Sequence, residues 1–211
     1  MENNQKPFHI RRKQNKTQIM LTHTSRDLKF YLMTLKYRYG GNFERIPSYI
    51  ISKDGKVTNL FEAKYSSNYF GTRRIDNRAI IISLENNGWL KKHHLSGKFM
   101  NWVGDIYFKK PFEKKWRGFG FWDSYTDEQY KSLSDLIIKL SGEFDIPLEY
   151  VGHNTKITGV QNFKGITSRS NYSDIHTDVS PAFDFKKLKQ YIDEKPKVAA
   201  KYNLILLVFI I

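Results

Sequence analysis

Short apolar runs alternate along this chain with segments whose apolar residues recur at helical spacing. The apolar run at residues 18–22 predicts a strand that ends at His23. Apolar residues at helical spacing follow from 28 to 35, and we expect Ser25 to cap that helix. The beginning of the chain therefore predicts a strand followed by a helix.

The next segments predict a hairpin and a buried strand. Residues 46–52 and 57–61 read as two strands, and the sequence Lys-Asp-Gly-Lys at 53–56 is typical of the turn between them. Residues 79–84 contain three consecutive isoleucines. Such a run is typical of a strand that is covered on both faces of a sheet.

The second half of the chain predicts two helices and another strand. Thr126 and Gln129 form a capping box ahead of a long apolar stripe. Residues 148–151 predict a strand that runs into His153, and residues 183–192 predict the last helix. Because strands and helices alternate, we expect an α/β fold: a single domain with a central mixed β-sheet flanked by α-helices.

Changes in composition divide the chain into three parts. Residues 1–16 form a polar, basic arm, residues 17–195 the folded domain, and residues 196–211 an apolar tail. The tail is too short to cross a bilayer, so we interpret it as a final strand or docking segment, with a truncated membrane anchor as the alternative. Residues 89–122 form an aromatic and basic insertion within the domain.

Charge and cysteine content restrict the classes of partner and chemistry. The net charge of +14 over 211 residues indicates an anionic partner: nucleic acid, a membrane surface or an acidic polymer such as the bacterial wall. The chain has no cysteine, which excludes disulfides, thiolate nucleophiles and cysteine-based zinc sites.

Histidine and aspartate side chains follow several of the predicted strands and turns. His23, His153, His176 and Asp178 each lie beside an apolar run or a turn signal. Imidazole nitrogen and carboxylate oxygen suit zinc, and three protein ligands with one open position are typical of a catalytic zinc site. Taken alone, His23 could equally be an ordinary strand-end histidine, and Asp178 a turn residue ahead of Pro181.

Five blocks of sequence, in this order, resemble the zinc-dependent N-acetylmuramoyl-L-alanine amidases of the type-2 family, which share their fold with peptidoglycan-recognition proteins. The resemblance covers nearly the whole chain. The blocks are residues 20–25, 49–57, 78–86, 125–130 with 152–154, and 177–185.

The resemblance implies a reaction and a set of site residues. The reaction is hydrolysis of the amide between N-acetylmuramic acid and L-alanine of peptidoglycan. The implied Zn²⁺ ligands are His23, His153 and Asp178. Glu85 is the implied general base. The alternative is that Glu85 is an ordinary exposed acid at the end of a strand. His176 stands where the family usually has a lysine, so it is the candidate oxyanion donor. Two alternatives remain: His176 is a metal ligand in place of Asp178, or it is an exposed turn residue.

The chain departs from the family pattern between His153 and Asp178. The family usually places these two ligands much closer together in sequence. The intervening segment contains Arg169, Asn171 and Tyr172, which we expect to contact substrate.

The insertion at 89–122 contains all four tryptophans of the chain among many lysines. Aromatic rings can stack on sugar faces, so Trp102 is a candidate substrate-binding residue. The same mixture suits single-stranded nucleic acid, and it is also compatible with tryptophans packed under a long surface loop.

The sequence therefore predicts a zinc amidase that acts on peptidoglycan, from a phage (an endolysin) or from a bacterium that remodels its own wall. The alternatives are a non-catalytic peptidoglycan-binding module and, with charge as its only support, a basic nucleic-acid-binding protein. We expect a monomer without a membrane span or signal peptide. It would be made in the cytoplasm and act on the cell wall after phage release or export by another route.

Overall fold

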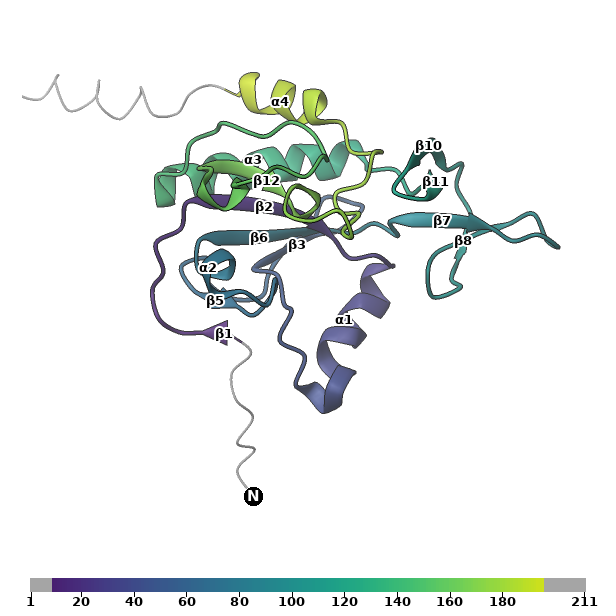
Figure 1. Cartoon of the computed structure of the whole chain (residues 1–211), viewed down its shortest axis with the longest axis horizontal. Helices are drawn as coiled ribbons and strands as arrows, with labels where there is room; N and C mark the ends of the chain where they lie inside the picture. The colour runs from purple at the N-terminus through teal and green to yellow at the C-terminus, as the bar shows by residue number, and fades with distance from the viewer. Residues whose placement is uncertain (1–8, 196–211) are drawn as a thin grey trace, which may run out of the picture.

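A sheet of five strands forms the centre of the molecule (Figure 1), seen in a computed structural model that describes residues 9–195. The strand order is β12-β2-β6-β3-β4, and every neighbouring pair is parallel except β3 with β4. The strands are β2 (Gln18–His23), β3 (Tyr49–Ile51), β4 (Val57–Asn59), β6 (Ala79–Leu84) and β12 (Gly165–Ser168). Because the carboxyl ends of parallel strands share one edge, residues that follow β2, β6 and β12 are brought together there.

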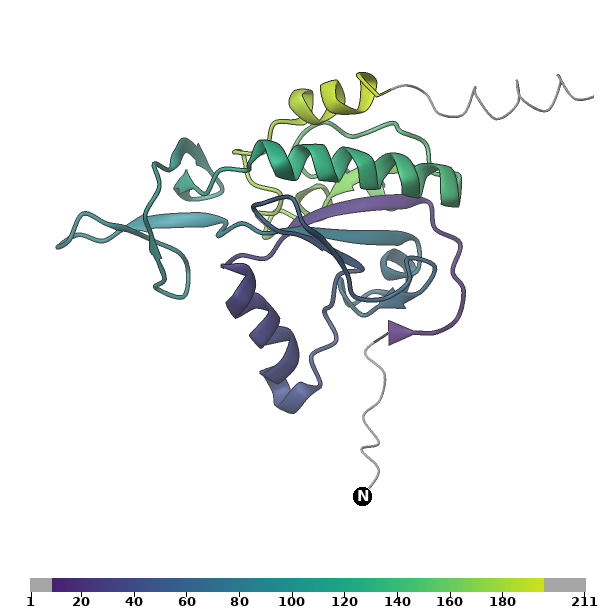
Figure 2. The same ribbon diagram turned by 180° about the vertical axis from the view of Figure 1, so that it is seen from behind.

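Two helices cover one face of this sheet. Helices α3 (Asp127–Phe144) and α4 (Phe185–Asp193) lie on the same side, and α3 runs along the sheet (Figure 2). Their apolar side chains form the main core with the strand residues, including Leu21, Ile80 and Ile82. On the opposite side lie α1 (Leu28–Tyr37), which projects from the sheet, and the short α2 (Arg73–Asp76). Burial of this core is the main source of stability.

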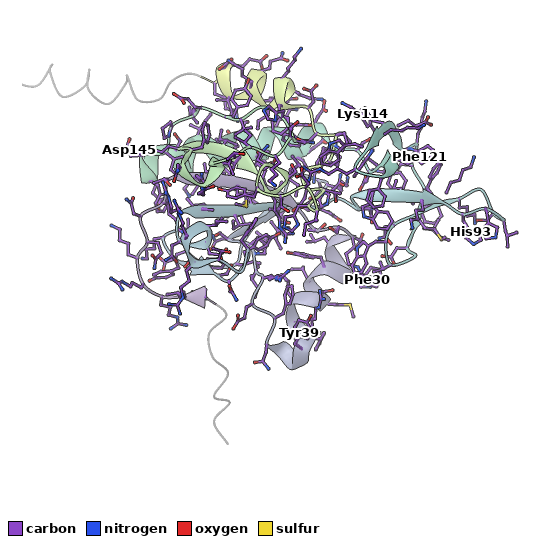
Figure 3. All side chains as sticks on the ribbon, viewed as in Figure 1. Phe30, Tyr39, His93, Lys114, Phe121 and Asp145 are labelled. Atoms are coloured by element: carbon purple, nitrogen blue, oxygen red, sulfur yellow. The ribbon has the colours of Figure 1, made fainter. Side chains whose placement is uncertain are left out.

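The insertion forms a separate antiparallel sheet of order β10-β11-β7-β8-β9, which extends to one side of the central sheet (Figure 1). Figure 3 places His93 at the outer tip of this extension, far from the central sheet. Its strands are β7 (Trp89–Lys92), β8 (Phe99–Met100), β9 (Ile106–Tyr107), β10 (Phe112–Trp116) and β11 (Phe119–Trp122). A further short pair joins β1 (His9–Ile10) to β5 (Ser66–Ser67), and 3-10 turns span Arg38–Gly41, Val160–Asn162 and Arg169–Asn171.

The predicted α/β fold is confirmed, and so are its strongest elements. Strand β2 ends at His23 as predicted, and all six residues of β6 are buried. The capping box is present: the Thr126 hydroxyl accepts a hydrogen bond from the Gln129 backbone N–H, and the Gln129 side chain accepts one from Thr126. The hairpin of β3 and β4 is also present, with shorter strands than predicted.

Two local predictions are wrong. Residues 148–151 form no regular strand: Tyr150 makes an isolated bridge to Ile166 on the outer edge of β12. Two backbone hydrogen bonds accompany it, from the Val151 N–H to the Ile166 carbonyl and from the Ile166 N–H to the Glu149 carbonyl. Strand β12, which the sequence did not predict, takes the place beside β2. Ser25 does not cap α1: it lies at φ 61°, and the Asp27 carboxylate accepts the hydrogen bond from the Lys29 N–H instead.

Within residues 9–195 there is no helix of the length and apolar character needed to cross a membrane. The apolar tail at 196–211 and most of the basic arm lie outside the described residues. The proposed division into arm, domain and tail stays a prediction.

A lysine is buried where the chain enters β2. Lys16 is only 2% exposed, and its ammonium group donates to the carbonyl oxygens of Ala79 at 2.9 Å and Asp76 at 3.3 Å. Burial lowers the pKa of Lys16 from 10.5 to about 7, and the nearby Asp76 carboxylate opposes this shift. The folded protein therefore loses this proton at a lower pH than the unfolded chain does.

This burial predicts a pH dependence of stability. Between pH 7 and about 10 the unfolded chain binds more protons at Lys16 than the folded protein does, so the free energy of unfolding should rise with pH. Lys16→Met should remove this contribution, and the exposed Lys139→Met should not. Urea unfolding of the three proteins across this pH range measures it. A difference between wild type and Lys16→Met that does not change with pH would contradict the assignment.

Candidate functional site

The candidate site lies where the parallel strands end. His23 is the last residue of β2, Glu85 follows β6, and Arg169 follows β12. The parallel register sets Ser168 of β12 opposite Leu21 of β2, so the residues that follow both strands emerge at the same edge. A loop between β12 and α4 brings Asp178 to this edge, and the Ser170 backbone N–H donates to the Asp178 carbonyl at 2.7 Å.

His23 is enclosed on both sides of its ring. Its Nδ1 lies 3.3 Å from the Tyr125 hydroxyl, and the side chain is 5% exposed. Gly88, at φ +72°, closely approaches the other side: a Cβ at this position would lie 3.0 Å from His23 Nε2. Burial lowers the pKa of His23 below 6.5, so the imidazole is neutral at neutral pH.

Asp178 is buried beside a buried arginine. The Asp178 side chain is 6% exposed and that of Arg169 18%, and Arg169 Nη1 lies 3.6 Å from Asp178 Oδ2. This distance makes an ion pair that is longer than a hydrogen bond. The guanidinium also lies over the rings of Tyr69 and Phe70, at 5.4 and 5.9 Å. A fixed positive charge is thus built into the centre of the site.

A cavity of about 180 Å³ opens from this centre toward α1. His23, Arg169 and Trp102 all contribute to its wall, and Trp102 is held by a hydrogen bond from its indole N–H to the Ser25 carbonyl at 2.8 Å. Trp102 and His23 also line a neighbouring hollow with Gly88 and Trp89. The predicted substrate-binding residues Trp102 and Arg169 are therefore placed beside His23.

Several residues of the site were missed by the sequence interpretation. Tyr125 contacts His23 and also accepts a hydrogen bond from the Ser180 N–H at 3.3 Å. Asp123 is 1% exposed and pairs with Lys53 at 3.0 Å. Tyr125 did fall within a block that carried the family resemblance, which was the one signal available for it.

His153 is not brought to this centre. It is exposed, and its Nδ1 accepts a hydrogen bond from the Thr155 N–H at 3.1 Å. The prediction that His23, His153 and Asp178 converge is wrong because the segment that leads into His153 lies on the outer edge of β12, and not beside β2. Strand β12 occupies that place, and the residue at its end is Arg169.

These residues do not fit the zinc site that the sequence implied. Across residues 9–195 no group of three or more histidine, cysteine, aspartate or glutamate side chains is arranged to hold a metal ion. A zinc site needs at least three such ligands, and the guanidinium beside Asp178 stays protonated and has no lone pair to offer. The centre combines one imidazole, one carboxylate and one permanent cation.

His176 is half-buried, with its ring edge-on to Phe70 at 5.5 Å. Burial, with a contribution from the Arg169 charge, lowers the pKa of His176 to about 4. A neutral ring cannot replace the charge of the lysine that the family usually has near this position. The cation beside Asp178 is Arg169 instead.

Three other candidate residues are engaged in the framework. The two Glu85 carboxylate oxygens accept hydrogen bonds from the backbone N–H groups of Leu28 at 2.9 Å and Lys53 at 2.8 Å. Asn171 is fully buried, and its amide donates to the carbonyls of His153 and Thr155. The Tyr172 hydroxyl donates to the Gln18 side chain. Direct contact of Asn171 with substrate is therefore excluded by its burial.

The chain belongs to the N-acetylmuramoyl-L-alanine amidase family, whose model matches residues 12–170. The family and enzyme class predicted from the resemblance are thereby confirmed. The match includes His23, Glu85 and Arg169 and ends before Asp178. No curated protein matches this chain in a sequence search.

Solved structures of amidases are similar to this chain, and the two with TM-scores above 0.5 share its fold. AmiD from E. coli, in complex with anhydro-N-acetylmuramic acid-L-Ala-D-gamma-Glu-L-Lys, has a TM-score of 0.55 at 14% identity over 90% of this chain and 62% of that chain. AmpDh3 from Pseudomonas aeruginosa, in complex with an anhydromuramic pentapeptide, has a TM-score of 0.53 at 13% identity, over 90% and 65% of the two chains. LysC from Clostridium intestinale has a TM-score of 0.48 at 14% identity, over 86% and 87%.

The contacts of Glu85 predict a structural role. Glu85→Ala removes two hydrogen bonds between a carboxylate and backbone N–H groups, so it should lower the free energy of unfolding by about 2–3 kcal/mol. Urea unfolding measures this loss. Glu85→Gln, with one acceptor oxygen, should be intermediate. A Glu85→Gln protein of wild-type stability with abolished activity would instead support the role of general base.

The buried pair of Asp178 and Arg169 predicts strong coupling. Asp178→Asn leaves the guanidinium buried without a countercharge, and we expect a loss of about 3 kcal/mol in the free energy of unfolding. The double variant Asp178→Asn/Arg169→Met should be less destabilised than the sum of the two single changes. Denaturant unfolding of the wild type, the two single variants and the double variant measures the interaction energy of the two charges. Strict additivity would show that the two charges do not interact.

Proposed function

We propose that this chain acts on peptidoglycan and hydrolyses the amide between N-acetylmuramic acid and L-alanine of the stem peptide. The observation that carries the proposal is the buried grouping of His23, Asp178 and Arg169 at the carboxyl edge of an amidase-family sheet. This edge is where open α/β sheets bind their ligands.

The related structures support the choice of substrate. AmiD and AmpDh3, which share the fold, were both solved with muramic peptides. The cavity beside His23 and the neighbouring hollow share His23 and Trp102, and together their polar and aromatic walls suit a ligand with a sugar and a peptide portion. The net charge of +14 favours approach to an anionic wall polymer.

Two side chains of this chain are given roles in the proposed hydrolysis. Neutral His23, held by Tyr125, is able to accept a proton from an attacking water. The Arg169 guanidinium, positioned by Asp178, supplies a fixed positive charge that holds an anionic part of the substrate beside His23. Zinc is the cofactor that the family resemblance implies, but no step is assigned to it because the ligand set does not fit.

Binding of peptidoglycan without cleavage is the second candidate function. It is favoured by Arg169, which stands beside Asp178 where a hydrolytic zinc centre would need a further ligand. In this case the cavity and the neighbouring hollow would hold the muramic peptide, and neither His23 nor Arg169 would need to take part in a reaction.

The hydrolytic proposal predicts release of stem peptides with a free L-alanine amino group from purified sacculi and from soluble muropeptide. His23→Ala should lower the rate at least hundredfold, because a positioned proton acceptor contributes about that much. The exposed Lys139→Met should retain the wild-type rate. Chromatography with mass spectrometry measures the products.

The outcomes separate the two candidates. Saturable binding of intact muropeptide with no released peptide would support the second function and overturn the first. Neither binding nor cleavage would overturn both.

A further inference from the structure

The cavity beside His23 is lined by arginines. Arg26, Arg38, Arg45 and Arg169 all contribute to its wall, and no aspartate or glutamate among the described residues does. Arg26 is neutralised by Asp105 at 3.4 Å. Within residues 9–195 neither Arg38 nor Arg45 takes part in an ion pair, so the wall carries positive charge that is not balanced locally.

Arg169 is only partly satisfied. Its one carboxylate contact is the 3.6 Å approach to Asp178, and its Nε is buried without a hydrogen-bond partner within the described part of the chain. The same holds for Oδ2 of Asp178, whose side chain is 94% buried. The contacts of Arg169 within the described residues therefore leave part of the hydrogen-bonding capacity of its guanidinium unused. Arg169 lines the cavity, whereas Asp178 does not.

We propose that Arg169, together with Arg38 and Arg45, makes this cavity a metal-independent binding site for a carboxylate of the peptidoglycan stem peptide. The inference rests on the proposed peptidoglycan function and deepens it. The guanidinium takes the place of a metal ion as the fixed positive charge beside Asp178, and a second cation there would be repelled by it.

The chemistry of the stem peptide explains the choice of ligand. In the peptide seen with AmiD, glutamate follows alanine and is linked through its gamma carboxyl. Its alpha carboxylate is therefore free, one residue from the amide that the proposed reaction cleaves. A planar guanidinium fork matches a carboxylate with two parallel hydrogen bonds. A cavity of about 180 Å³ fits a group of this size rather than a whole disaccharide.

The test measures binding of soluble muramoyl tripeptide by titration calorimetry, in EDTA and in added zinc. Equal affinity in both conditions is expected. A tripeptide whose alpha carboxylate is amidated should bind about tenfold more weakly, as expected when an anion loses its charge-assisted hydrogen bonds. Inorganic phosphate serves as competitor, and weak competition is expected. Displacement of the peptide by phosphate at equal concentration would overturn the carboxylate assignment.

Matched variants assign the effect to these side chains. Arg169→Lys keeps the charge but not the fork and should weaken binding, with Arg169→Met weaker still. Arg38→Met and Arg45→Met test the same cavity without disturbing the buried pair, should Arg169→Met fail to fold. The exposed Arg74, whose guanidinium contacts Asn162 at 3.1 Å on another part of the surface, gives the control Arg74→Met. It should bind like wild type.

Zinc content provides an independent readout. Wild-type protein dialysed against zinc should retain well below one equivalent by elemental analysis, and Arg169→His should retain more because imidazole is a zinc ligand. Stoichiometric zinc in the wild type, or binding abolished by EDTA, would overturn this inference and leave the proposed function standing. Failure of every muropeptide to bind or be cleaved would instead overturn the proposed function.

Discussion

The contact between Arg169 and Asp178 is the interaction on which the character of the site depends. Removing two charges from water is costly, and a 3.6 Å separation recovers only part of that cost. The pair persists because the sheet imposes it: the register of β12 on β2 sets the start of the following turn, and the Ser170 N–H ties that turn to the Asp178 carbonyl. The same two charges act on the pKa of His23 in opposite directions: Asp178 raises it and Arg169 lowers it.

Elements with strong local signals were predictable from the sequence. The isoleucine run of β6 is a strand covered on both faces, and the capping box at Thr126 begins α3 because both of its hydrogen bonds are made by neighbours in sequence. His23 was predictable as a candidate site residue for the same reason, since it is the last residue of an apolar strand. These features require only local geometry and a choice between a buried and an exposed face.

Features that depend on long-range pairing were not predictable. Strand β12 begins with glycine and ends with threonine and serine, a composition typical of a loop, and it becomes a strand only through its pairing with β2. The segment before His153 has the more apolar sequence, yet it lies outside β12 and makes a single bridge. Because only one of the two segments can occupy the place beside β2, this competition decides whether a histidine or an arginine reaches the centre.

A guanidinium and a metal ion place positive charge near a substrate in different ways. A metal is lost when its histidine ligands are protonated or when a chelator competes for it, whereas a guanidinium is covalently fixed and remains charged at every pH at which the protein is folded. The metal offers open coordination positions and activates water, while the guanidinium offers only directed hydrogen-bond donors. With Arg38 and Arg45 on the same wall, the proposed site favours orientation of an anionic ligand, and the proposed proton acceptor is the neutral imidazole of His23.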